Sequence, residues 1–185
     1  SPLARRAALV LGAIASIPAA PTAAARPVPA PVPPTPQPLG TTVRVSVTGA
    51  GAQSAGPTQP ELRGVALSED GRFVAFTSRA ADLVPGDGNG LEDVFLRDTV
   101  LGTTVRASGA PGGADGNGFC RSCDVSDDGR FVVFSSAASN LAPGDGTGCR
   151  DVSLRDVALG TTTLVSRGAG GGSGNGISRR PSLSG

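Results

Sequence analysis

The sequence predicts an all-β chain of four-stranded antiparallel sheets in tandem, which are the blades of an incomplete β-propeller ring. Three observations predict this fold class: a gapless internal repeat, four strand-like segments in each copy, and turn residues between those segments. The 185 residues include 28 glycines and 16 prolines, a proportion typical of a chain with many turns.

The internal repeat is the strongest of these observations. Residues 67–108 align with residues 125–166 without a gap, and 25 of the 42 aligned positions are identical. Matched residues such as Asp70 and Asp128 are 58 positions apart throughout. Because a repeated unit buries its faces only against its neighbours, this periodicity predicts units that stack side by side.

Each copy predicts four strands. In the first copy these are residues 64–68, 72–78, 93–98 and 103–108. Asp70-Gly71 is a two-residue hairpin signal between the first two strands. The Phe-Val-Ala-Phe run from Phe73 places apolar side chains on both faces of its strand, which predicts a sheet covered on both sides. An open β-solenoid is the alternative fold.

The repeat extends beyond the two aligned copies. Complete blades are expected at about residues 60–108 and 118–166, with partial units at both ends of the repeat region, residues 40–185. Residues 40–47 copy the fourth strand of a unit, and residues 181–185 begin a third unit. A closed propeller needs at least four blades, so we expect a piece of a longer protein.

The first 39 residues predict export rather than a folded domain. Residues 1–25 combine two arginines, a small-apolar run over 7–20 and an Ala-x-Ala sequence at 23–25, which is typical of a signal peptide. A membrane anchor is the alternative, although prolines interrupt the apolar run. Residues 26–39 form a proline-rich linker. We therefore expect a periplasmic or extracellular protein with no transmembrane span after signal cleavage.

The composition argues against several classes of function. The chain has no histidine, so Ser-His-Asp and Cys-His relays would lack their base, and three cysteines are too few for a four-thiolate zinc site. A net charge of +1 with interspersed signs offers no basic surface for nucleic acid. Carboxylates that recur in both copies, such as Asp70 and Asp98, are expected to have structural roles. We therefore expect neither an enzyme nor a nucleic-acid-binding protein.

The two copies resemble a known family of repeats. Their cores, LSEDGRFVAFTSRAADLVPGDGNGLEDVFLRD and VSDDGRFVVFSSAASNLAPGDGTGCRDVSLRD, resemble the TolB-like, WD-type propeller repeats of exported bacterial proteins. The resemblance covers about residues 40–185. It implies a non-catalytic scaffold that binds a protein or another ligand in the cell envelope or outside the cell, in an oligomeric state that the sequence leaves open. The alternative is the non-catalytic propeller of a larger, prolyl-oligopeptidase-like hydrolase, whose catalytic domain would lie outside this chain.

The longest loops predict where a ligand binds. In a propeller blade, the loop between strands two and three and the loop that leads to the next blade emerge on the same face. Here these loops are residues 85–90, 110–118, 143–148 and 168–176. Variable loops on a rigid scaffold are where binding usually occurs, so we predict a ligand-binding face there. Its polar residues are Asp87, Asn89, Asp115, Asn117, Asp145 and Asn175.

One of these loops resembles a calcium loop. Asp87, Asn89 and Asp93 supply oxygen ligands at its first, third and seventh positions, which makes calcium the one cofactor that the sequence indicates. Leu91 occupies the fifth position, where calcium loops place another ligand. The interpretation we favour is a turn built from glycine and Asx residues, with Asp93 bonded to local amides and no cofactor, and calcium is the alternative.

The three cysteines occur only in the second copy. Cys120, Cys123 and Cys149 stand where the first copy has leucine or valine. The first and third strands of a blade begin at the same end, so the three sulfurs are expected to be neighbours. In an exported protein we predict a disulfide from Cys149 to Cys120, or to Cys123 as the second choice. Buried free thiols are the alternative.

Overall fold

A computed structural model describes residues 42–54, 64–146 and 148–184 of the chain. The predicted signal peptide, residues 1–25, and the linker, residues 26–39, lie outside the described residues. Nearly all regular structure in the described part is β-strand, apart from one short 3₁₀ turn, η1 (Pro111–Gly113). Within that part, no helix has the length and apolar character needed to span a membrane.

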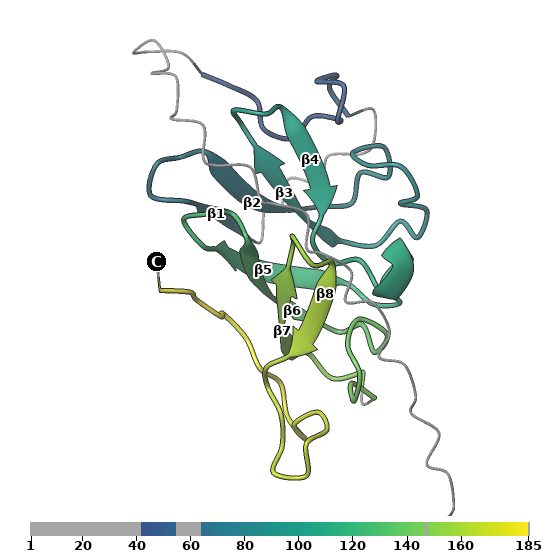
Figure 1. Cartoon of the computed structure of the whole chain (residues 1–185). Coiled ribbons are helices and arrows are strands. Elements are labelled where there is room, and N and C mark those ends of the chain that lie inside the picture. The colour runs from purple at the N-terminus through teal and green to yellow at the C-terminus, as the bar shows by residue number, and fades with distance from the viewer. Residues whose placement is uncertain (1–41, 55–63, 147, 185) are drawn as a thin grey trace, which may run out of the picture. The chain divides into compact units, whose positions relative to one another are not determined.

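The strands form two sheets of four, each in plain sequential order and antiparallel throughout (Figure 1). The first sheet holds β1 (Val65–Leu67), β2 (Phe73–Ser78), β3 (Asp93–Asp98) and β4 (Thr103–Arg106). The second sheet holds β5 (Cys120–Val125), β6 (Phe131–Ser136), β7 (Asp151–Asp156) and β8 (Thr161–Leu164). The predicted fold class, four-stranded antiparallel blades in tandem, is therefore confirmed. We call β1–β4 with the loop that follows them the first unit, and β5–β8 with their following loop the second.

The turn between β1 and β2 shows why the sequence folds in this way. Gly71 has a φ of 69°, which favours glycine, and Asp70 Oδ1 accepts a hydrogen bond from the Arg72 amide over 2.9 Å. The Arg72 guanidinium then reaches Asp98 at the end of β3, with Nη2 and Oδ2 2.8 Å apart. Asp98 Oδ1 also accepts the amide of Leu101 in the next turn. These carboxylates have the structural roles that their repetition predicts.

The central strands are buried on both faces, as their apolar runs predict. On one face of the first sheet, Ala75 and Leu96 belong to a core that includes Cys123 and Val125 of β5. On the other face, Phe76 stacks against Phe95, with ring centroids 5.8 Å apart. Thus the two sheets share one hydrophobic core, and the first sheet has a second, smaller core behind it.

Matched positions on the first strand of each sheet differ sharply in burial. Cys123 and Val125 on β5 are only 9% and 6% exposed, because β5 packs against the first sheet. Val65 and Leu67, at the corresponding positions of β1, are 48% and 60% exposed. Among the described residues, nothing covers β1 as the first sheet covers β5.

The partial units at the two ends contact the sheets without extending them. Residues 42–54 contain no strand of a sheet; they have one isolated bridge, Val47 to Gln53. The predicted copy of a fourth strand at 40–47 is thus not a sheet strand over its described part, although Val47 O accepts a hydrogen bond from Thr104 Oγ1 of β4 over 3.0 Å. At the other end, the Leu183 amide donates to Asp124 Oδ2 of β5 over 2.9 Å.

Candidate ligand-binding face

The long loops of each unit lie together at one end of its sheet. In the first unit, the Gly88 amide of the β2–β3 loop donates to Asp115 Oδ2 of the β4–β5 loop over 3.2 Å. Asn89 Nδ2 of the same loop donates to Gly116 O over 2.9 Å. In the second unit, the Ser173 amide donates to Gly144 O over 3.2 Å. The loops therefore meet as blade geometry predicts, while ligand binding by them stays a prediction.

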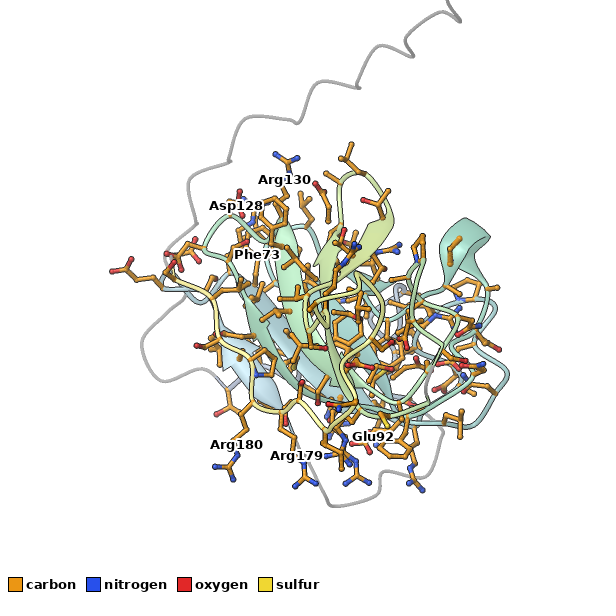
Figure 2. The ribbon with its side chains drawn as sticks, turned by 90° about the horizontal axis from the view of Figure 1, so that it is seen from below. Phe73, Glu92, Asp128, Arg130, Arg179 and Arg180 are labelled. Atoms are coloured by element: carbon orange, nitrogen blue, oxygen red, sulfur yellow. The ribbon has the colours of Figure 1, made fainter. Side chains whose placement is uncertain are left out.

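The opposite end of the sheets carries the Asp-Gly turns. Figure 2 shows Phe73, Asp128 and Arg130 close together at this end, with Glu92 at the other. Asp128 Oδ1 accepts hydrogen bonds from Ser126 Oγ over 2.6 Å and from the Arg130 amide over 2.9 Å. These bonds, that from Ser126 above all, lower the pKa of Asp128. The polar side chains of the short turns at this end are thus hydrogen-bonded within the turns themselves.

Arg106 at the end of β4 ties the first pair of loops together. Its guanidinium Nη1 pairs with Asp115 Oδ1 and lies 3.7 Å from Asp87 Oδ1, while Nη2 donates to Gly113 O over 2.8 Å. Burial raises the pKa of Asp87, and the negative charge of Asp115 adds to the rise, whereas Arg106 opposes it. Two predicted face residues, Asp87 and Asp115, are thus brought together around a buried arginine.

The predicted calcium ligands of this loop are bound by protein groups in the structure. Asn89 Oδ1 accepts the Leu91 amide over 2.7 Å, as in an Asx turn, and Asn89 Nδ2 lies 3.5 Å from Asp93 Oδ2. Asp93 Oδ1 accepts a hydrogen bond from Ser108 Oγ over 2.5 Å. Calcium at these residues stays a prediction. The hydrogen bonds are those of a local turn built from Asx side chains.

Asp93 is the most perturbed carboxyl group of this end. Its side chain is fully buried at the start of β3, and this burial raises its pKa to about 6. The Ser108 hydroxyl and the Arg106 guanidinium oppose the rise, while the charge of Asp87 contributes to it. Asp93 is therefore a buried carboxyl group with a pKa close to neutral pH, and it lies directly beneath the long loops.

Asn117 joins the loops of the two units. Its side-chain Oδ1 accepts a hydrogen bond from the Ser139 backbone amide over 2.8 Å, and its backbone amide donates to Asn140 Oδ1 over 3.0 Å. Asn140 Nδ2 in turn donates to Asp115 O over 2.9 Å. The predicted face residue Asn117 thus links the β4–β5 loop to the β6–β7 loop of the second unit.

The second unit places its two predicted face residues differently. Asp145 is buried, and its Oδ1 accepts a hydrogen bond from Ser173 Oγ over 3.1 Å. Burial raises the pKa of Asp145, and the neighbouring charge of Asp151 adds to this. Asn175 is exposed on the last long loop. Of these two residues, Asn175 is therefore the one placed to contact a partner directly.

Two features of this end were not predicted from the sequence. One is Arg106, whose counterpart in the second unit is Leu164. The other is an arginine pair over Phe119, in which the guanidinium carbons of Arg121 and Arg150 lie 4.8 and 5.4 Å from the ring centroid. The signal was available as substitutions at matched positions, since Leu164 replaces Arg106, and Phe119 and Arg150 each stand where the first copy has glutamate.

A β-bulge determines where two of the cysteines lie. The register of β5 against β6 shifts between Arg121 and Cys123, and Ser122 between them has a φ of 47°. Because of this extra residue, Cys120 and Cys123 both lie in the shared core, and both are free thiols in the structure. Cys120 Sγ donates to Ser136 Oγ over 3.3 Å. The predicted disulfide to Cys149 is not formed in this structure and stays a prediction.

Comparison with known proteins adds two partial likenesses. No model of a protein family matches the chain, and no curated protein matches it. The crystal structure of TolB from Acinetobacter baumannii is similar over 66% of this chain, with 18% identity and a TM-score of 0.41. A structure described as a TolB from Agrobacterium tumefaciens is similar over 56% of this chain, with 19% identity and a TM-score of 0.38. The chain spans 24% and 30% of the lengths of those proteins.

Proposed function

We propose that this chain is part of an exported, non-catalytic propeller scaffold that binds a protein or another envelope ligand through its long-loop face. One observation carries the proposal. The long loops of each unit converge at one end of its sheet and are fixed to one another by hydrogen bonds, as by Asn89 in the first unit and Ser173 in the second. Asn117 bonds the loops of the first unit to the second.

Such fixed loops favour binding for an energetic reason. Ordering a flexible loop on association costs free energy, about 0.5–1.5 kcal/mol for each side chain that is immobilised. Loops already bonded to each other incur less of this cost. The opposite end offers less to a partner, because tight turns such as that at Asp128 bind their own polar groups. The loop face is therefore the better binding surface of the two.

A non-catalytic role agrees with the chemistry of the side chains. The sequence contains no histidine, and Asp87 and Asp115 of the first-unit loops both pair with the Arg106 guanidinium. Export is supported by the signal-like sequence of residues 1–25. Both features suit a scaffold outside the cytoplasm.

The test compares exposed positions on the two ends of the sheets. The full chain is immobilised and exposed to an envelope extract of the bacterium that encodes it, and each retained protein is then purified and titrated calorimetrically. Pro111→Arg and Asn175→Arg on the loop face should weaken its binding at least tenfold. The matched controls, Leu101→Arg and Leu159→Arg at exposed turns of the other end, should leave it unchanged. The reverse pattern would place binding on the Asp-Gly end and refute the proposal.

A further inference from the structure

The loop ends of the two units differ by a linked pair of substitutions. Arg106 of the first unit corresponds to Leu164 of the second, and Asp115 corresponds to Ser173. The second unit thus lacks the guanidinium that faces Asp87 in the first. It nevertheless keeps Asp145, the counterpart of Asp87, and also the counterpart of Asp93.

That retained pair of carboxylates, Asp145 and Asp151, is buried and only half satisfied. Asp145 is 7% exposed and Asp151 is 0% exposed. One oxygen of each accepts a hydroxyl: Asp145 Oδ1 from Ser173, and Asp151 Oδ1 from Ser166 over 2.7 Å. The other oxygen, Oδ2 in both residues, is buried with no hydrogen-bond partner. A buried carboxylate oxygen without a partner is costly, so an occupant is expected at this position.

The surroundings indicate a cation as that occupant. The two serines that bind these carboxylates lie side by side, because the Ser166 carbonyl accepts the amide of Gly174, the residue after Ser173, over 3.1 Å. Within the described residues, no arginine forms an ion pair with either carboxylate. Ser153 Oγ, two positions further along β7 from Asp151, is a third buried oxygen that lacks a partner. All three groups are oxygen ligands, which hard cations prefer.

We propose that the loop end of the second unit binds Ca²⁺ through Asp145 and Asp151, with loop oxygens and water completing the coordination. The ion would supply the positive charge that Arg106 supplies among the carboxylates of the first unit. No group of three or more acidic, cysteine or histidine side chains gathers as a metal cluster in the described part of the chain. A site with two carboxylates suits the weak affinities of extracellular calcium modules, with a Kd of about 0.1–1 mM.

Calorimetric titration of the full chain with CaCl₂, after dialysis against EDTA, tests this site. We expect one binding event of sub-millimolar to millimolar Kd, together with a higher Tm in 10 mM CaCl₂. Asp145→Asn and Asp151→Asn, which keep the shape of the side chain but remove its charge, should each weaken binding at least tenfold. Asp127→Asn, which removes an exposed charge at the opposite end of the second unit, should leave the affinity unchanged. Asp87→Asn, in the first unit, is measured beside these variants.

A transplant of the first unit's ion pair gives a second, independent measurement. The double variant Leu164→Arg with Ser173→Asp rebuilds the Arg106–Asp115 pair in the second unit, and it should fold and no longer bind calcium. If the asparagine variants do not fold, the double variant tests the calcium site. If the double variant does not fold, the asparagine variants test it. No heat from the wild-type chain up to 10 mM CaCl₂ would mean that the orphan oxygens hold water or a proton. Equal binding by all variants, or loss only in Asp87→Asn, would also overturn the proposal.

Discussion

The two units share 25 of 42 aligned residues and the same strand order, yet matched positions in them differ in burial and in charge. Leu67 is exposed whereas its counterpart Val125 is buried, because among the described residues only the second sheet has a neighbour that covers its first strand. Arg106 and Leu164 differ in the sequence itself. A repeated sequence therefore sets the shape of a unit, whereas neighbours and substitutions decide what each unit can contact.

The largest effect expected from this comparison concerns the first strands. Val125→Asp places an unpaired charge in the shared core and should lower the free energy of unfolding by about 3–5 kcal/mol. Leu67→Asp, at the matched exposed position, should change it by less than about 0.5 kcal/mol. Urea unfolding followed by circular dichroism at pH 7 measures both. Similar losses in the two variants would show that β1 is covered as β5 is.

A smaller difference is expected at the two Asp-Gly turns. Gly71 and Gly129 both have a φ near 68°, but an added Cβ at Gly71 meets open space, while at Gly129 it would lie 2.4 Å from the Phe73 ring. Gly71→Ala should cost about 1–2 kcal/mol from backbone strain alone. Gly129→Ala adds overpacking, worth about 1–3 kcal/mol more.

Thermal and urea unfolding of the two alanine variants compare these costs. Combining Gly129→Ala with Phe73→Leu should recover part of the additional loss, since the smaller side chain can move away. If Gly71→Ala proves as costly as Gly129→Ala, the second turn does not pack on Phe73 as the structure shows.

The strands were largely predictable because their signals are local. The predicted strand at 93–98 matches β3 in full, and that at 72–78 is one residue longer than β2. Glycines that adopt positive φ, such as Gly71 and Gly102, mark the turns in both units. The exception is 40–47, which copies a strand sequence but forms no sheet strand over its described part, because a strand also needs a partner with free hydrogen-bonding groups.

The loop face was only partly predictable. Asp87, Asn89 and Asp115 come together as expected, because the blade topology alone determines where loops emerge. The role of Arg106 was missed. The strand pattern places this residue in β4, but it does not show that its long side chain extends to the loop carboxylates Asp87 and Asp115. The bulge at Ser122 was missed as well, because one extra residue in a strand leaves no signal in the alternation of so short a segment.

A pH-dependent effect is expected from Asp93 in the first unit. Its folded pKa of about 6 lies above the value near 3.9 of an unfolded chain, so the folded state binds this proton more tightly. Stability from this group is therefore fully present below about pH 4 and is lost as the pH rises through 6. With 1.36 kcal/mol for each pKa unit, the change is on the order of 3 kcal/mol. Asp93→Asn should remove it.

Urea unfolding at pH 4, 5, 6 and 7 measures this slope in the wild type and in Asp93→Asn. Asp70 and Asp128 have lowered pKa values, so their contributions have the opposite sign and are lost only as the pH falls below about 4. They therefore affect both proteins equally. Parallel pH profiles for the two proteins would show that Asp93 is not the buried acid responsible.

The smallest expected effect distinguishes the cysteines, which only the second unit has. Burial raises the pKa of the Cys120 and Cys123 thiols to about 12, so neither forms the reactive thiolate at pH 8. In the reduced, folded chain, iodoacetamide should therefore modify neither of them. Both should become modifiable once the chain is unfolded in urea. When the unfolded chain is refolded in air, with oxygen as the oxidant, the predicted disulfide from Cys149 to Cys120 or Cys123 would lower the intact mass by two hydrogen atoms. One of the three cysteines would then remain to be alkylated on unfolding. Three alkylated cysteines after oxidation would refute the disulfide, and rapid native labelling of Cys120 or Cys123 would contradict their place in the shared core.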